Sequence, residues 1–164
     1  MEFKSAATKD GNSLQLKFSG SIDEDTTFPA VDLGGVNTVV IDLNDIKAIN
    51  SVGIRGWLDW IRPVAEKAQI QLVNCPKAMV FQFNMVNGFL PPGTVVKSFY
   101  VPFFCEKCDK ESNVLFRVGQ EVVVNGTDLK INVDAKSASG CTDADCELEM
   151  DVTEAKYFQF LKRA

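Results

Sequence analysis

The chain has no histidine among its 164 residues. Without an imidazole group it lacks Ser-His-Asp and Cys-His catalysis, and it lacks every zinc site that uses histidine ligands. The sequence also shows no acid and base pair, no nucleophile placed beside a base, and no metal site with an open position. We therefore predict that the protein is not an enzyme.

Long apolar segments are missing as well. No run of about 18 apolar residues is present, as a membrane-spanning helix would need. The first residues, Met1 to Lys4, lead into polar residues and not into the hydrophobic segment of a signal peptide. These two absences predict a cytoplasmic protein without membrane insertion.

Positive charge is scarce in both parts of the chain. Residues 1–104 contain 9 Lys and Arg against 10 Asp and Glu, and residues 105–164 contain 8 against 12. Because binding to nucleic-acid phosphates requires a surface rich in Lys and Arg, we do not expect a nucleic-acid partner. No glycine-rich phosphate loop of the GxxxxGK[ST] type occurs either, so no nucleotide site is predicted.

The composition is otherwise that of a folded protein. Apolar residues make up 46% and charged residues 24% of the chain, which is ordinary for a globular protein with a hydrophobic core. The length suits one domain of about 100 residues and a further module of about 50.

The first part of the chain alternates strand and helix patterns. Phe3–Ala7 and Ser13–Ser19 predict a hairpin around an Asp-Gly turn. Asp23 and the residues after it predict a short helix that ends at Pro29 or shortly after it. Residues 36–43 (VNTVVIDL) form a β-branched run typical of a central strand that is buried on both faces.

Two further helices and two strands follow. Ser51–Lys67 carries apolar residues at three- and four-residue steps, which predicts an amphipathic helix packed on the sheet. Residues 70–73 predict a strand, residues 76–88 a helix that starts with proline and ends near glycine, and residues 95–104 another strand. The fold class is α/β (α+β), with a mixed sheet and helices mainly on one face.

Over residues of about 1–102 the chain resembles the STAS family, named for sulfate transporters and anti-sigma-factor antagonists. The matching segments are FSGSID (18–23), VVIDL (39–43), INSVGI (49–54) and IQLVN (70–74). The resemblance implies a STAS-like sheet and a bacterial protein that acts in signal transduction. Fold resemblance alone does not fix function.

In the regulatory members of that family, an Asp-Ser-(Ser/Thr)-Gly motif carries the phosphorylated hydroxyl just before the glycine. This chain has Asn50-Ser51-Val52-Gly53 instead, so Val52 occupies the phosphoacceptor position. Ser51 is interpreted as a helix N-cap in preference to a phosphorylation site. We predict that the partner-binding face consists of these four residues and Arg55.

The resemblance therefore implies a non-catalytic protein-interaction domain. Its partner would be an anti-sigma-factor-like kinase or a subunit of a transport complex. The alternative is a cytoplasmic lipid- or small-ligand-binding STAS module of a transport complex, since related proteins have that role.

Four of the five cysteines lie in two close pairs, Cys105 with Cys108 and Cys141 with Cys146. Two such pairs can bring four thiolates to one tetrahedral point, so they predict a structural zinc site. A redox motif is disfavoured because no helix pattern follows Cys108, and a disulfide because no signal peptide is present. Cys75 is interpreted as a core residue.

The residues around these pairs alternate like short strands and resemble a zinc ribbon. We predict a STAS-like domain in residues 1–102 and a zinc-ribbon-like module in residues 103–164, which loss of the metal would unfold. The aromatic residues just before Cys105 either join the two parts or form an outer apolar patch. They are Phe99, Tyr100, Phe103 and Phe104.

Overall fold

The computed structural model describes residues 1–163. Its first sheet has the strand order β1-β2-β3-β4-β5, in which β1 is antiparallel to β2 and every other neighbouring pair is parallel. The predicted mixed sheet is therefore confirmed. Its strands are β1 (Lys4–Asp10), β2 (Ser13–Ile22), β3 (Thr38–Ile49), β4 (Gln69–Val73) and β5 (Val95–Val96).

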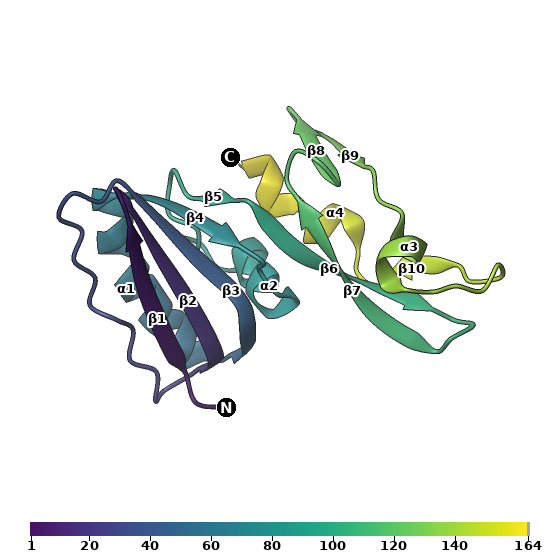
Figure 1. Ribbon diagram of the computed structural model, residues 1–164. Coiled ribbons are helices and arrows are strands. Elements are labelled where there is room, and N and C mark those ends of the chain that lie inside the picture. The colour runs from purple at the N-terminus through teal and green to yellow at the C-terminus, as the bar shows by residue number, and fades with distance from the viewer. Residues whose placement is uncertain (164) are drawn as a thin grey trace.

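Strand β3 lies at the centre of this sheet, as predicted, but only one of its faces is fully buried. Val39, Ile41 and Leu43 are buried, whereas Val40 and Asp42 between them remain half-exposed. The prediction of burial on both faces was wrong because both helices of this part of the chain lie on the same side of the sheet (Figure 1).

These helices are α1 (Ser51–Lys67) and α2 (Lys77–Met85). The apolar face of α1 packs on the sheet through Trp57, Ile61 and Val64, as the periodicity predicts. The indole N–H of Trp57 donates to the backbone oxygen of Phe89 at 3.0 Å, which joins α1 to the segment after α2. Along the part of the chain that the structure describes, no helix combines the length and apolar character needed to cross a bilayer.

The predicted helix after Asp23 does not form. Thr26 closes a local turn instead, because its hydroxyl accepts from the backbone N–H of Asp23 at 2.8 Å. Phe28 then stacks on Trp60 of α1 with 5.3 Å between ring centroids, and the Trp60 indole donates to the Pro29 carbonyl at 2.8 Å. Proline also disfavours helical geometry in the residue before it. The connection to β3 therefore crosses α1 as an irregular chain.

Strand β1 forms the outer edge of the first sheet. The hairpin with β2 turns at Gly11, whose φ of 60° favours glycine, and the predicted Asp-Gly turn is confirmed. All seven residues of β1 are exposed. Strand β1 therefore adds backbone hydrogen bonds to β2 but buries almost no apolar surface of its own.

The C-terminal part is built around a second, antiparallel sheet with the order β10-β6-β7. The predicted strand over residues 95–104 breaks at Lys97, so that β5 remains in the first sheet while β6 enters the second. Strand β6 passes through the predicted domain boundary between residues 102 and 103. The remaining elements are β6 (Ser98–Cys105), β7 (Lys110–Arg117), β8 (Val122–Asn125), β9 (Asp128–Ile131), α3 (Ala135–Ser139), β10 (Leu148–Met150), α4 (Glu154–Tyr157) and a 3-10 helix, Gln159–Arg163.

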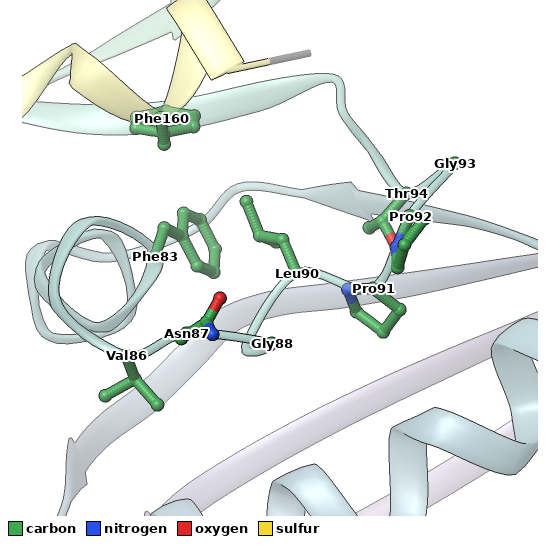
Figure 2. Close-up of a pocket in the computed structure, with 10 residues that line it drawn as sticks. All are labelled: Phe83, Val86, Asn87, Gly88, Leu90, Pro91, Pro92, Gly93, Thr94 and Phe160. Carbon is green, nitrogen blue, oxygen red and sulfur yellow. The ribbon is translucent and has the colours of Figure 1, made fainter.

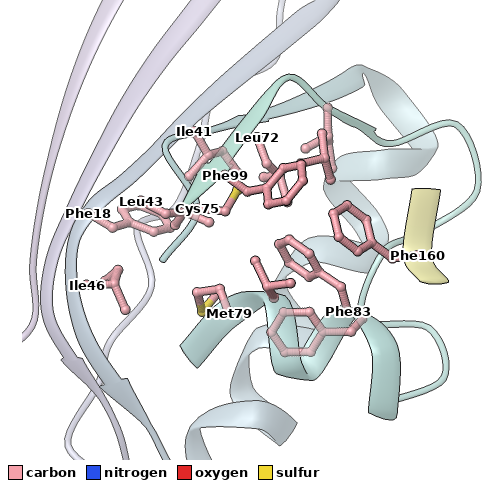
Figure 3. Close-up of a cluster of buried hydrophobic side chains, with 14 of the residues drawn as sticks. Phe18, Ile41, Leu43, Ile46, Leu72, Cys75, Met79, Phe83, Phe99 and Phe160 are labelled. Atoms are coloured by element: carbon pink, nitrogen blue, oxygen red, sulfur yellow. The ribbon is translucent and has the colours of Figure 1, made fainter. Parts of the chain in front are cut away.

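One hydrophobic core extends through both sheets. Phe99, at the start of β6, is fully buried, and its ring lies 5.7 Å from that of Phe158 and 5.1 Å from that of Phe160. Phe99 and Phe160 belong to the same buried cluster as Leu72 of the first sheet (Figure 3). Phe99 and Phe103 are buried and Tyr100 and Phe104 are half-exposed, so these aromatic residues mainly join the two parts and do not form an outer patch.

We expect Phe99→Ala to destabilise the protein by about 3–5 kcal/mol, because it leaves a cavity between both sheets. Urea unfolding followed by tryptophan fluorescence measures this, since Trp57 and Trp60 lie in the first part of the chain. Val123→Ala, at an exposed position of β8, should stay within about 0.5 kcal/mol of the unaltered protein. If the urea concentration at the midpoint of the fluorescence transition were unchanged in Phe99→Ala, the two parts would unfold independently.

Candidate metal centre

The first cysteine pair occupies the turn between β6 and β7. Cys105 is the last residue of β6, and Cys108 lies two residues before β7 begins. Asp109 follows with a positive φ of 48°, which reverses the chain direction. The β6–β7 hairpin thus presents both sulfur atoms on one tight turn.

The second pair flanks a loop between α3 and β10. Helix α3 ends at Gly140, whose left-handed conformation (φ 78°) directs the chain into Cys141. The backbone N–H of Cys146 donates to the Asp143 carbonyl at 3.1 Å, and the N–H of Asp145 donates to the Asp143 carboxylate at 3.0 Å. Strand β10 then pairs with β6, Leu148 opposite Cys105, which brings the second loop beside the first.

The four predicted ligands meet at one point. The sulfur atoms of Cys105, Cys108, Cys141 and Cys146 all lie within 4.8 Å of one another. A tetrahedral zinc site with Zn–S bonds of about 2.3 Å has sulfur atoms about 3.8 Å apart, so this donor set fits such an ion. Four sulfur ligands also leave no position open for a catalytic water molecule.

The four thiols differ in their surroundings. Cys105, Cys141 and Cys146 are buried, whereas Cys108 is exposed. The backbone N–H of Cys108 lowers the pKa of Cys105 to about 7, and burial raises the pKa of Cys146. Hydrogen bonds to Cys146, whose sulfur is 3.4 Å away, and then to Cys105 raise the pKa of Cys108 to about 12. Cys105 therefore loses its proton more readily than Cys108 or Cys146.

An ion pair that we did not predict connects the two cysteine loops. The ammonium group of Lys107 lies 2.7 Å from a carboxylate oxygen of Asp143 and 3.2 Å from one of Asp145. The hydrogen bond to Asp143, followed by that to Asp145, raises the pKa of Lys107. Lys107 in the first spacer and the two aspartates in the second carry opposite charges, but the sequence alone does not indicate that these loops meet.

The fifth cysteine lies elsewhere. Cys75 is fully buried in the main core, beside Leu43 in Figure 3, and burial raises the pKa of its thiol well above the usual value. Its interpretation as a core residue is confirmed. All five cysteines are free thiols in this structure.

The predicted partner-binding residues surround the N-terminus of α1. Asn50, and not Ser51, is the N-cap, because its side-chain oxygen accepts from the backbone N–H of Gly53 at 2.8 Å. The Asn50 amide also donates to Glu24 at 2.7 Å. The backbone N–H of Glu24 itself, and then the Asn50 amide, hold the pKa of Glu24 below its usual value.

Four of these five residues are accessible. Asn50, Ser51, Val52 and Arg55 are exposed. Gly53 is buried, because the helix approaches the end of β2 so closely that a Cβ atom there would lie 2.1 Å from the Ile22 carbonyl oxygen. Gly53 therefore fixes the position of the helix terminus and does not itself offer a contact surface.

A comparison with models of known protein families finds none that matches this chain, and a comparison with curated proteins finds no matching sequence. The resemblance to STAS domains stays a prediction that rests on the sequence segments quoted above.

The lowered pKa of Cys105 predicts how proton release changes with pH when a divalent metal binds the thiols. With a pKa of about 7, Cys105 is mostly a thiolate at about pH 8 and mostly protonated near pH 6, so metal binding should release more protons at the lower pH. Calorimetric titration of the metal-free protein in buffers of different ionisation enthalpy counts these protons. Cys75→Ala, which alters a thiol outside the cluster, should give the same count. Release of fewer than two protons at about pH 8 would exclude binding by all four thiolates.

Proposed function

We propose that this protein is a non-catalytic protein-interaction module of the STAS type, acting in regulation, with a structural zinc ion in its C-terminal part. The interaction is mediated by the N-terminus of α1. Its partner is a protein similar to the kinase-type anti-sigma factors that regulatory STAS domains bind. The zinc ion folds the two cysteine loops and takes no part in chemistry.

The observation that carries this proposal is the exposure of Val52. Its side chain is 54% exposed in the first turn of α1, although valine is usually buried. Two hydrogen bonds of Asn50 hold the helix terminus that carries Val52. The Asn50 side chain caps the helix, and the Asn50 backbone N–H donates to the Ile22 carbonyl at 3.1 Å. A rigid helix terminus with an apolar residue between Ser51 and Arg55 suits a protein contact.

Val52 also bears on how the contact is regulated. In the antagonists that this chain resembles, phosphorylation adds negative charge at that position and disfavours the complex. Valine carries no hydroxyl group, so a kinase has no acceptor atom there. The chain binds its partner without this phosphate switch.

We expect Val52→Asp to weaken partner binding at least about tenfold, because it adds a charge to the centre of the proposed contact. An acidic residue in the first turn favours a helix, so the fold should remain intact. The measurement is quantitative capture of the anti-sigma-factor-like partner from lysate of the source organism, with affinity then determined on the purified pair. Val123→Asp is the matched control, since it makes the same change at a distant exposed position. Equal affinities of the Val52→Asp and Val123→Asp proteins would rule out this face as the docking site.

A second candidate function is binding of a small ligand, and one hollow in the surface favours it. This hollow, about 360 Å³ in volume, lies between the end of α2, the loop that follows it and the C-terminal 3-10 helix (Figure 2). Phe83, Leu90, Pro91 and Phe160 supply apolar walls, and the hydroxyl oxygen of Thr94 is buried without a hydrogen-bond partner. A ligand with an apolar body and a hydrogen-bonding group suits this hollow. Native mass spectrometry of freshly purified protein distinguishes the two functions, because only the second requires a bound small molecule.

Removal of the metal should loosen a limited part of the chain. Tyr157, Phe158 and Phe160 pack in the shared core, so they do not depend on the metal for burial. We expect chelation to increase amide exchange in residues 105–113 and 134–148 while residues 157–160 stay protected. Hydrogen exchange with mass spectrometry, before and after treatment with a thiol-compatible chelator, measures this. Unchanged exchange around both cysteine pairs would contradict a structural role for zinc.

A further inference from the structure

The spacing of the second cysteine pair is not explained by metal binding alone. Structural zinc sites often have two residues between paired cysteines, whereas four separate Cys141 from Cys146. The longer spacer contains Asp143 and Asp145, and both carboxylates contact Lys107 in the spacer of the first pair. The additional residues thus provide acidic groups that reach the opposite loop.

Asp143 both stabilises the turn before Cys146 and contacts Lys107. Its carboxylate accepts the Asp145 backbone N–H, and its carbonyl accepts the Cys146 N–H, so it shapes the turn that leads into the second ligand. The same carboxylate is the closer partner of Lys107, at 2.7 Å. The turn that positions Cys146 is therefore tied to the turn that joins Cys105 to Cys108.

The contact of Lys107 with the two aspartates also affects the net charge around the metal site. One divalent ion with four thiolates has a net charge of about −2, and Asp143 and Asp145 add further negative charge nearby. Lys107 is the cation in contact with both carboxylates. Lys110, also close in sequence, donates instead to the Ser139 carbonyl at 3.4 Å. The ammonium group of Lys107 therefore offsets part of the negative charge that gathers at the two loops.

We propose that Lys107 is a positioning residue of the metal centre, which holds the two cysteine loops together through Asp143 and Asp145 and offsets the negative charge of the four thiolates. This inference rests on the proposed function, since it requires that the four cysteines bind a metal. Lys107 acts on the ion through the ligands and the loops and does not itself bind it.

The size of the effect follows from the exposure of the groups. The Lys107 and Asp143 side chains are 40% and 49% exposed, and Asp145 is 84% exposed. An exposed ion pair changes an equilibrium by a factor of about five at most, and salt weakens it. Lys107 takes part in two such pairs, and its positive charge also attracts the nearby thiolates. Together these effects predict a change in metal affinity of about tenfold at low salt.

The test compares Co²⁺ binding by the full-length protein and its Lys107→Ala, Lys107→Arg and Lys130→Ala variants. Co²⁺ reports tetrahedral sulfur ligation through its absorption spectrum. We expect Lys107→Ala to bind about tenfold more weakly at about 20 mM salt, with a much smaller loss at about 500 mM, and Lys107→Arg to restore most of the affinity. Lys130 is an exposed residue of β9, so Lys130→Ala controls for the change in net charge.

A double-variant cycle separates the ion pair from other effects. If Lys107 acts through the carboxylates, Asp145→Asn should weaken binding less in the Lys107→Ala background than in the unaltered protein. Equal affinities of Lys107→Ala and Lys130→Ala at both salt concentrations would overturn the inference, as would a loss that salt does not reduce and arginine does not restore. Absence of the cobalt–thiolate spectrum in the unaltered protein would instead refute the proposed metal centre itself.

Discussion

The contact of Phe99 with the C-terminal aromatic residues is the interaction on which the arrangement of the two sheets depends. Strand β6 starts beside the first sheet and ends at Cys105. At its start the Cys75 backbone N–H donates to the Ser98 carbonyl, and the Tyr100 backbone N–H donates to the Cys75 carbonyl. Because a strand is stiff over such a length, burial of Phe99 fixes the direction in which the hairpin and its cysteines project. The C-terminal segment then folds back and covers the same ring.

The far end of the hairpin has much less apolar surface. Cys105, Cys141 and Cys146 form a separate buried cluster in which Leu148 is the partly buried neighbour. So few apolar groups cannot offset the entropy lost when two loops become ordered. In the metal-bound form that we propose, metal–sulfur bonds supply the missing stabilisation, and the ion pair of Lys107 adds a smaller contribution. Under this proposal the molecule combines an apolar core that needs no metal with a thiolate cluster that does.

Local patterns predicted those elements whose neighbours are close in sequence. The α1 periodicity, the Asp-Gly hairpin and the paired cysteines all follow from residues a few positions apart. The helix after Asp23 failed because Trp60, more than thirty residues away, holds Phe28 and Pro29 in an extended chain. The break at Lys97 was missed for a similar reason, since residues 95–104 have a uniform β pattern and only sheet pairing separates β5 from β6. The Lys107 contact required knowledge of which loops meet.

The exposed edge strand β1 has a consequence for behaviour in concentrated solution. Its outer backbone groups offer a template on which another chain can pair, and no apolar side chain needs burial there. Lys4 and Lys9 stand near its two ends, and charged side chains on an edge strand disfavour pairing with another chain. The residues between them are small, so they offer little side-chain surface against which another strand could pack. The edge is thus protected by its charged residues and by its lack of large apolar side chains, so the sequence of β1 matters more for keeping separate molecules apart than for burying the core.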